Sequence, residues 1–151
     1  MIDPKLLNKF IKVCERAAFG ASKFKGKNDK IAADKAAVDE MRSELNKIDI
    51  NGKIVIGEGE MDEAPMLYIG EKVGTGKGEN LDIALDPLEG TNFAANNLPG
   101  ALSVIAIAEK NNLFKLNSSA AFMLRRYKRK TCSLSISNMW LLLRLGSQHG
   151  K

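Results

Sequence analysis

Two acidic segments of the sequence each follow a short run of strand-forming residues. The first, Gly57-Glu58-Gly59-Glu60, comes directly after Ile54-Val55-Ile56, and the second, Asp86-Pro87-Leu88-Glu89-Gly90-Thr91, comes directly after residues 81–85. Loops at strand ends concentrate binding and catalysis because the sheet holds them rigid. The proline bends the chain away from its strand, so we expect the two carboxylates of the second segment to turn into one space.

Carboxylates that converge in this way repel one another unless a cation lies between them. Oxygen ligands suit Mg²⁺ or Mn²⁺ rather than zinc. The Thr91 hydroxyl is placed to orient a water, and backbone N–H groups around Gly90 and Thr91, opening a helix over residues 92–96, are suited to receive a phosphate. These features predict metal-assisted hydrolysis of a phosphate ester, with two metals holding the attacking and leaving oxygens. The spacing alone favours a solvated turn at residues 86–91 over a metal site.

The elements that must position these residues begin with two helices. The first is predicted over residues 3–20, with Asp3 as N-cap, Pro4 at the first helical position and Gly20 as the stop. The second is predicted over residues 32–47 because apolar residues recur at helical spacing along one face. That face consists of Ala33, Ala37, Met41 and Leu45.

A turn at Asn51-Gly52 is predicted to precede the sheet. Strands are expected at residues 53–57, covered on both faces because the run is apolar throughout, and at residues 81–85 and 101–108. The glycine-rich stretch 74–78 reads as a hairpin or connector because it lacks the pattern of a phosphate loop. Two helices followed by a sheet indicate an α+β layered domain.

Composition excludes several classes of protein. The 151 residues suffice for about one ordinary domain, and 44% hydrophobic with 27% charged residues excludes a disordered, collagen-like or coiled-coil chain. Two cysteines cannot form a disulfide framework, and the start of the chain lacks a secretory signal, so we expect the cytoplasm. Cys14 lies on an apolar helical stripe and is predicted to belong to the core, whereas His149 is expected to have no catalytic role.

Charge divides the chain into two unlike pieces near Phe114-Lys115. All 18 acidic residues lie in 1–114 with 15 of the 23 Lys and Arg, a net charge of 15 − 18 = −3. Residues 115–151 hold the other 8 basic residues and no acid, a net charge of +8. We therefore predict a domain over 1–114 and an unrelated basic tail over 115–151.

The acidic segments closely resemble the class II fructose-1,6-bisphosphatases of bacteria, within the lithium-sensitive, metal-dependent sugar and inositol phosphatases. The long run from Gly57 to Tyr68, the run from Gly70 to Gly76 and the Asp-Pro-x-Glu-Gly-Thr motif at residues 86–91 carry the resemblance. The short motif alone indicates only the wider group, which leaves an inositol-monophosphatase-like activity as an alternative. The resemblance covers residues 1 to about 114.

The resemblance implies that Asp34 and Glu58 bind one Mn²⁺ or Mg²⁺ ion and that Asp86 and Glu89 bind the second. It implies catalytic roles for Glu58 and Thr91, and contact of Glu89, Gly90 and Thr91 with the sugar phosphate. The implied reaction removes the 1-phosphate of fructose 1,6-bisphosphate, a step of gluconeogenesis, and some members accept sedoheptulose 1,7-bisphosphate. The implied fold is a layered α/β/α/β/α arrangement, of which this chain carries the N-terminal part, and the implied assembly is a homo-oligomer.

Beyond residue 114 the sequence departs from that family. The segment that carries a substrate-binding Tyr in the family reads Lys115-Leu116-Asn117-Ser118-Ser119-Ala120. We expect the tail to be an out-of-frame translation and the chain to have little or no turnover. The alternative is a non-catalytic protein whose basic run at residues 125–130 binds RNA or an acidic surface. The metal-site interpretation predicts a sugar bisphosphate as the ligand and no nucleic acid or membrane partner.

Overall fold

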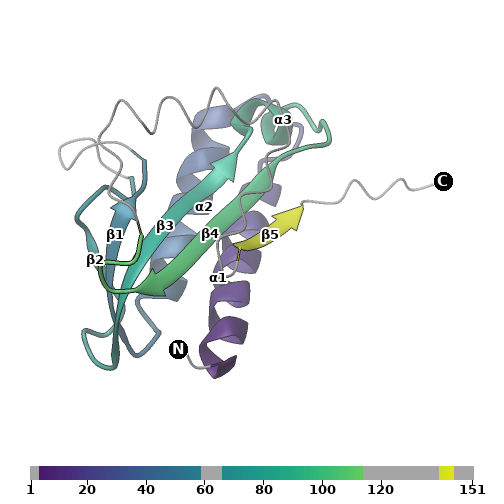
Figure 1. Cartoon of the computed structure of the whole chain (residues 1–151). Helices are drawn as coiled ribbons and strands as arrows, with labels where there is room; N and C mark the ends of the chain where they lie inside the picture. The colour runs from purple at the N-terminus through teal and green to yellow at the C-terminus, as the bar shows by residue number, and fades with distance from the viewer. Residues whose placement is uncertain (1–3, 59–65, 114–139, 145–151) are drawn as a thin grey trace.

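Two long helices come first in the chain and the strands follow, which confirms the predicted α+β order of the N-terminal part (Figure 1). The computed structural model describes residues 4–58, 66–113 and 140–144. The elements are α1 (Pro4–Ser22), α2 (Lys30–Leu45), β1 (Ile50–Ile56), β2 (Lys72–Val73), β3 (Glu79–Glu89), α3 (Thr91–Ala95), β4 (Leu102–Glu109) and β5 (Trp140–Arg144).

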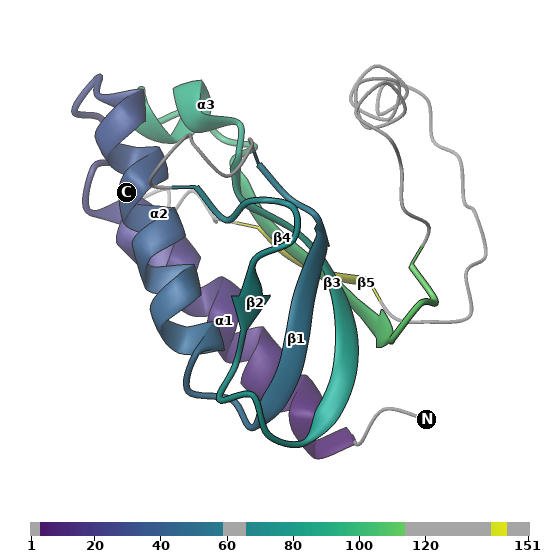
Figure 2. The same cartoon turned by 90° about the vertical axis from the view of Figure 1, so that its left-hand side faces the viewer.

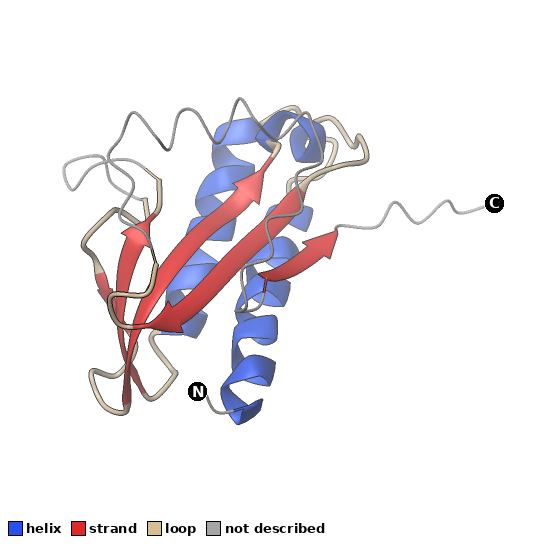
Figure 3. Cartoon of the chain, in the orientation of Figure 1, coloured by secondary structure: helices blue, strands red, loops and turns tan. Residues whose placement is uncertain are grey.

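The strands form a mixed five-stranded sheet in the order β2-β1-β3-β4-β5. Strands β1 and β3 are parallel, whereas each of the other neighbouring pairs is antiparallel. Helices α1 and α2 lie together on one face of this sheet (Figure 2), and colouring by secondary structure shows the short α3 near the end of β3 (Figure 3). The parallel β1–β3 pair places the carboxyl ends of both strands at one end of the sheet.

Helix α1 begins at Pro4, as predicted, while its expected N-cap Asp3 lies outside the described residues. The prediction that Gly20 ends the helix is wrong, because α1 continues to Ser22. A Cβ added at Gly20 would lie 2.5 Å from the Ala36 carbonyl oxygen of α2. Gly20 is therefore explained by the close approach of two helices and not by termination.

Helix α2 carries the predicted apolar stripe, since all four of its expected core residues are fully buried. The helix begins at Lys30, slightly before the predicted start, and Asp29 caps it by accepting a hydrogen bond from the Ala32 amide at 2.9 Å. A side chain at the N-cap satisfies one of the amides that a helix start leaves unpaired. The cap and the stripe together fix where α2 starts and which of its faces meets the core.

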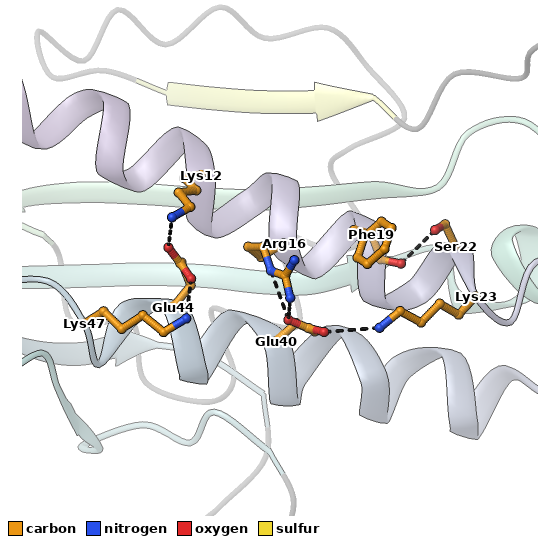
Figure 4. Close-up of polar contacts among 8 residues, drawn as sticks. All are labelled: Lys12, Arg16, Phe19, Ser22, Lys23, Glu40, Glu44 and Lys47. Atoms are coloured by element: carbon orange, nitrogen blue, oxygen red, sulfur yellow. Dashed lines mark hydrogen bonds and ion pairs between the residues drawn. The ribbon is translucent and has the colours of Figure 1, made fainter.

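Ion pairs join the two helices along their exposed edges (Figure 4). Lys12 lies 2.9 Å from Glu44, and Glu40 accepts hydrogen bonds from Arg16 Nε at 3.1 Å and from Lys23 at 3.3 Å. The hydrogen bond from Arg16 is the main cause of a lowered pKa at Glu40. These contacts fix α1 against α2 in addition to the packing of their apolar faces.

The predicted turn at Asn51-Gly52 is wrong, because both residues lie inside β1. Gly52 pairs with Val73 of β2 and with Leu81 of β3, and a Cβ there would lie 2.9 Å from the Ile83 side chain. The strand needs a glycine at this position to let its neighbours approach. The expectation that residues 53–57 are covered on both faces is confirmed at Ile54 and Val55, which are adjacent and both buried, and fails at Lys53, which is exposed.

The core lies between the helix pair and the inner face of the sheet. Its largest fully buried side chains include Phe10, Met41, Leu45, Ile50, Ile54, Ile83, Leu88 and Ile105. Cys14 is also buried in this core, as predicted. The glycine-rich stretch 74–78 connects β2 to β3, which agrees with the predicted connector. Among the described helices, none is long and apolar enough to cross a membrane.

Candidate metal and phosphate site

Glu58 and Asp86 lie at the same end of neighbouring parallel strands. Ile56 of β1 is in register with Ala84 of β3, so Glu58 and Asp86 each stand two residues further toward the carboxyl end of their strands. In a parallel pair, equal steps from a register position reach the same level of the sheet. The two strand-end carboxylates identified from the sequence therefore lie at the same end of the sheet, where β1 and β3 have their carboxyl ends.

A bulge in β3 places Asp86 and Glu89 on one face of the sheet. Asp86 pairs with Val104 and Glu89 with Leu102, so three steps along β3 match only two along β4. Side chains alternate along a strand, so residues three apart normally point to opposite faces. The extra residue of the bulge reverses that alternation, because Val104 and Leu102 lie on the same face and cross-strand partners share a face.

Core packing supports the bulge independently. Leu85 and Leu88 are also three residues apart in β3, yet both are buried and belong to the same core cluster. The expectation that Pro87 bends the chain away from its strand is wrong, because β3 continues to Glu89. Pro87 instead lies within the bulge, where its missing N–H interrupts a ladder that is already irregular.

Asp34 comes from the helix layer and lies in the second turn of α2. The loop before α2 is hydrogen-bonded to α3, with the Gly26 amide 3.3 Å from the Ala94 carbonyl oxygen and the Asn28 amide 2.9 Å from that of Ala95. Because α3 follows directly after β3, the start of α2 lies beside the carboxyl end of β3 (Figure 1). The fold thus brings Asp34 to the end of the sheet that carries Glu58 and Asp86.

Three of these carboxylates each have one buried oxygen, although the residues themselves are only half-buried. The Asp34 Oδ1, Glu58 Oε2 and Asp86 Oδ1 atoms are buried, and within the described residues Asp34 Oδ1 accepts no hydrogen bond. Burial raises the pKa of Asp34, since desolvation disfavours its charged form. A buried carboxylate oxygen with no donor near it is suited to a bound cation.

The donor set consists of oxygen atoms only, which fits Mg²⁺ or Mn²⁺. No group of three or more His, Cys, Asp or Glu side chains in the described part of the chain is arranged to hold a metal ion. Mg²⁺ sites, however, commonly use one or two carboxylates and complete their coordination with waters and substrate phosphate. Within the described residues, these carboxylates do not form a closed protein cage. Glu60, Asp62 and Glu63, which the sequence predicts to form a solvated acidic loop, lie outside the described residues.

The predicted helix after the second acidic segment is present as α3, which begins at Thr91 and ends at Ala95. Gly90 precedes it in the left-handed conformation, with φ of +82°, where a Cβ would lie 2.9 Å from the Phe93 ring. Glycine adopts this conformation without steric strain, because it has no Cβ atom. Gly90 therefore allows the chain to turn sharply from β3 into α3, with the half-buried Thr91 as the first helical residue.

Sequence reasoning missed the arginine that anchors the segment around Glu58. Arg42 of α2 donates hydrogen bonds from Nε to Glu71 Oε1 at 2.8 Å and from Nη2 to Glu71 Oε2 at 3.1 Å. Its Nη2 also donates to the Met66 carbonyl oxygen. Hydrogen bonding to Glu71 raises the pKa of Arg42 above its ordinary value. No local pattern marks this contact, because its partners lie more than twenty residues away in the sequence.

Several sequence predictions fall on residues that the structure does not describe. These are the basic run at 125–130, His149 and most of the predicted tail over 115–151. The described part of that tail is β5, whose backbone pairs antiparallel with β4, with Trp140 in register with Ala106. The predicted boundary near residue 114 remains a prediction.

Comparison with known proteins identifies close relatives. Residues 4–125 match the family model of the bacterial fructose-1,6-bisphosphatase encoded by glpX. The chain is 51% identical over 113 residues to a D-fructose 1,6-bisphosphatase class 2/sedoheptulose 1,7-bisphosphatase of Prochlorococcus marinus strain AS9601. It is 49% identical over 113 residues to the protein of the same name from Synechococcus sp. strain CC9902.

Each of these alignments covers 75% of the chain and 34% of the relative, so the chain spans about a third of the length of the curated relatives it matches. The match to the family model, over residues 4–125, includes both long helices and the acidic strand ends described above. Because the family model covers most of the chain, the chain belongs to the bacterial fructose-1,6-bisphosphatase family encoded by glpX.

Proposed function

We propose that this chain carries the N-terminal, metal-binding part of an enzyme that hydrolyses the 1-phosphate of fructose 1,6-bisphosphate. The names of its relatives support this substrate and add sedoheptulose 1,7-bisphosphate as a second one. The observation that carries the proposal is the buried Asp34 oxygen, which accepts no hydrogen bond within the described residues, at the end of the sheet where Glu58 and Asp86 lie. A divalent cation would compensate this buried charge.

We assign Asp34 and Glu58 to one Mn²⁺ or Mg²⁺ ion and Asp86 and Glu89 to a second. When bound, such ions would withdraw charge from the phosphate and favour deprotonation of the attacking water. The Thr91 hydroxyl would orient that water, and Glu89, Gly90 and Thr91 would contact the sugar phosphate. The β3 bulge supports the pairing of Asp86 with Glu89, because it puts both side chains on one face.

Turnover by this chain alone is expected to be low. The relatives have about two thirds of their length outside the matched segment, and positioning and charge stabilisation account for most of the catalysis of phosphoryl transfer. A homo-oligomer is proposed for the full-length enzyme. Release of inorganic phosphate from fructose 1,6-bisphosphate in the presence of Mn²⁺ checks this expectation. Activity equal to that of a full-length relative would contradict it.

Titration of Mn²⁺ into the purified chain tests the metal site directly. We expect saturable binding that Asp34→Asn weakens by about tenfold or more, since the substitution removes a charged ligand. Asp39→Asn is the matched control, because Asp39 is an exposed carboxylate on the same helix that pairs with Lys35. Equal weakening by both substitutions would indicate non-specific attraction to the acidic surface, and absence of binding would overturn the proposed site.

A further inference from the structure

We propose that Arg42 is a positioning residue for this site, and the inference rests on the proposed metal function. By joining α2 to the segment that runs beside the end of β1, Arg42 sets the separation between Asp34 and Glu58. These two carboxylates are assigned to one ion but come from different layers of the fold. A metal site needs its ligands held in place by groups behind them, as well as the ligands themselves.

Three backbone hydrogen bonds join the end of β1 to residues 67–71. The Glu58 amide donates to the Leu67 carbonyl oxygen at 3.1 Å, the Gly70 amide donates to that of Ile54 at 2.8 Å, and the Ile54 amide donates to that of Glu71 at 2.9 Å. The contact is close, because a Cβ at Gly57 would lie 2.3 Å from the Leu67 carbonyl oxygen. The backbone at Glu58 therefore follows the position of residues 67–71.

Arg42 holds residues 66–71 against α2. Its guanidinium bonds both oxygens of Glu71 and the Met66 carbonyl, and the Tyr68 amide donates to Glu71 Oε2 at 3.3 Å. The side chains of Arg42 and Glu71 are 27% and 12% exposed, so solvent screens the pair only partly. A planar guanidinium that bonds two acceptors fixes orientation as well as distance, which a lysine cannot reproduce.

Asp34 stands eight residues before Arg42 on the same helix, about 12 Å along its axis. The path from Asp34 to Glu58 thus runs along a rigid helix, through Arg42 to residues 66–71, and across the Leu67–Glu58 hydrogen bond. Each step of this path consists of contacts between described residues. Loss of the arginine would leave the two carboxylates without this fixed connection.

The direction in which Mn²⁺ affinity changes when Arg42 is replaced distinguishes a positioning role from a purely electrostatic effect. Arg42 is positively charged, so if only its charge mattered, replacing it with a neutral residue would tighten Mn²⁺ binding. If Arg42 positions Glu58, Arg42→Met weakens binding despite the removal of the positive charge. The two explanations therefore predict opposite changes in affinity.

The experiment compares Mn²⁺ affinity in the parent chain, Arg42→Met, Arg42→Lys and the control Arg16→Met. Arg16 suits the control because it also bonds one carboxylate through Nε and Nη2, yet these bonds join α1 to α2 and do not reach residues 66–71. Mn²⁺ affinity is measured at a temperature below the melting temperature of every variant. Arg42→Met is expected to weaken Mn²⁺ binding about tenfold or more, and Arg16→Met to change it less than twofold. Arg42→Lys is expected to weaken binding as well, and it keeps the test valid if Arg42→Met does not fold.

Hydrogen exchange at the Glu58 amide provides a readout that needs no metal. We expect faster exchange in Arg42→Met and Arg42→Lys and unchanged exchange in Arg16→Met. Unchanged or tighter Mn²⁺ binding by a folded Arg42 variant would overturn the positioning role. A parent chain that binds no Mn²⁺ would overturn the proposed metal site, and the Glu58 exchange rates would then still show whether Arg42 holds this segment.

Discussion

Gly20 of α1 lies directly against the backbone of Ala36 in α2, so close that a Cβ at Gly20 would stand 2.5 Å from the Ala36 carbonyl oxygen and 2.9 Å from Cγ of Glu40. The nearest contact is with backbone, which cannot move aside as a flexible side chain can. The two helices that carry the core, and with it Asp34, thus pack at a distance that only glycine permits.

Gly20→Ala is therefore expected to destabilise the chain by about 1–3 kcal/mol through overpacking. An alanine inside a helix normally stabilises by up to about 1 kcal/mol relative to glycine, so the steric effect reverses the usual sign. Asn8→Ala, at an exposed position of α1, is the control and is expected to stabilise by about 0.5 kcal/mol. Urea unfolding of the three proteins checks both signs, and a stabilised Gly20→Ala would contradict the close packing.

The elements that sequence predicted correctly are those set by local pattern. The α2 stripe is readable because its residues recur at helical spacing, and the site carboxylates are readable because they follow strand-forming runs. The predictions that Gly20 ends a helix and that Gly52 lies in a turn are wrong because glycine has two different structural roles. It marks chain reversal in a turn and close approach in a packed element, and only the three-dimensional neighbours distinguish them.

The candidate site shows the same division. Glu58, Asp86 and Glu89 were identified from motif and resemblance, whereas the bulge that turns Asp86 and Glu89 to one face depends on pairing with β4. Arg42 could not be identified from the sequence, because its proposed role depends on hydrogen bonds to Glu71, which lies 29 residues further along the chain. Candidate ligand and catalytic residues often occur in short sequence motifs. Residues that hold them in position often do not.

Glu44 is expected to make the stability of the chain pH-dependent on the acid side. It is buried, and hydrogen bonds from Lys47 and Lys12 lower its pKa below the ordinary 4.5. A carboxylate whose pKa is lower in the folded chain than in the unfolded chain stabilises the folded state at pH values above its ordinary pKa. This stabilisation is lost as the pH falls through the lowered pKa.

Glu44→Gln should accordingly lower the free energy of unfolding by about 1 kcal/mol at pH 7, and its stability should converge with that of the parent at the acid end. Urea unfolding at a series of pH values from neutral to acid measures this difference. Glu15→Gln removes the same charge from an exposed position and serves as the control. A parent–variant difference that stays constant with pH would show that Glu44 contributes through packing alone.

Cys14 is expected to be inert toward thiol reagents in the folded chain. Burial raises its pKa to about 11, so roughly one molecule in a thousand carries the thiolate at pH 8, and the side chain is inaccessible as well. With Cys132 replaced by serine, labelling of Cys14 at pH 8 should be at least about a hundredfold slower in buffer than in urea, since the thiolate fraction alone falls by about that factor. Similar rates in both conditions would show that the core around Cys14 opens readily.

Asp34→Asn is expected to raise the melting temperature of the metal-free chain at neutral pH. Burial raises the pKa of Asp34, which means that the folded state disfavours its charge, and asparagine removes that charge at similar size.

Saturating Mn²⁺ should reverse the order of the two melting temperatures. The parent should gain about 2.7 kcal/mol of stability at a Mn²⁺ concentration a hundred times its dissociation constant, while the variant gains little. Thermal unfolding with chelator and with Mn²⁺ measures both effects, and Asp39→Asn, exposed on the same helix, should show neither. A lower melting temperature for Asp34→Asn in chelator would mean that the Asp34 carboxylate stabilises the fold itself, and its assignment as a site kept for a cation would then be wrong.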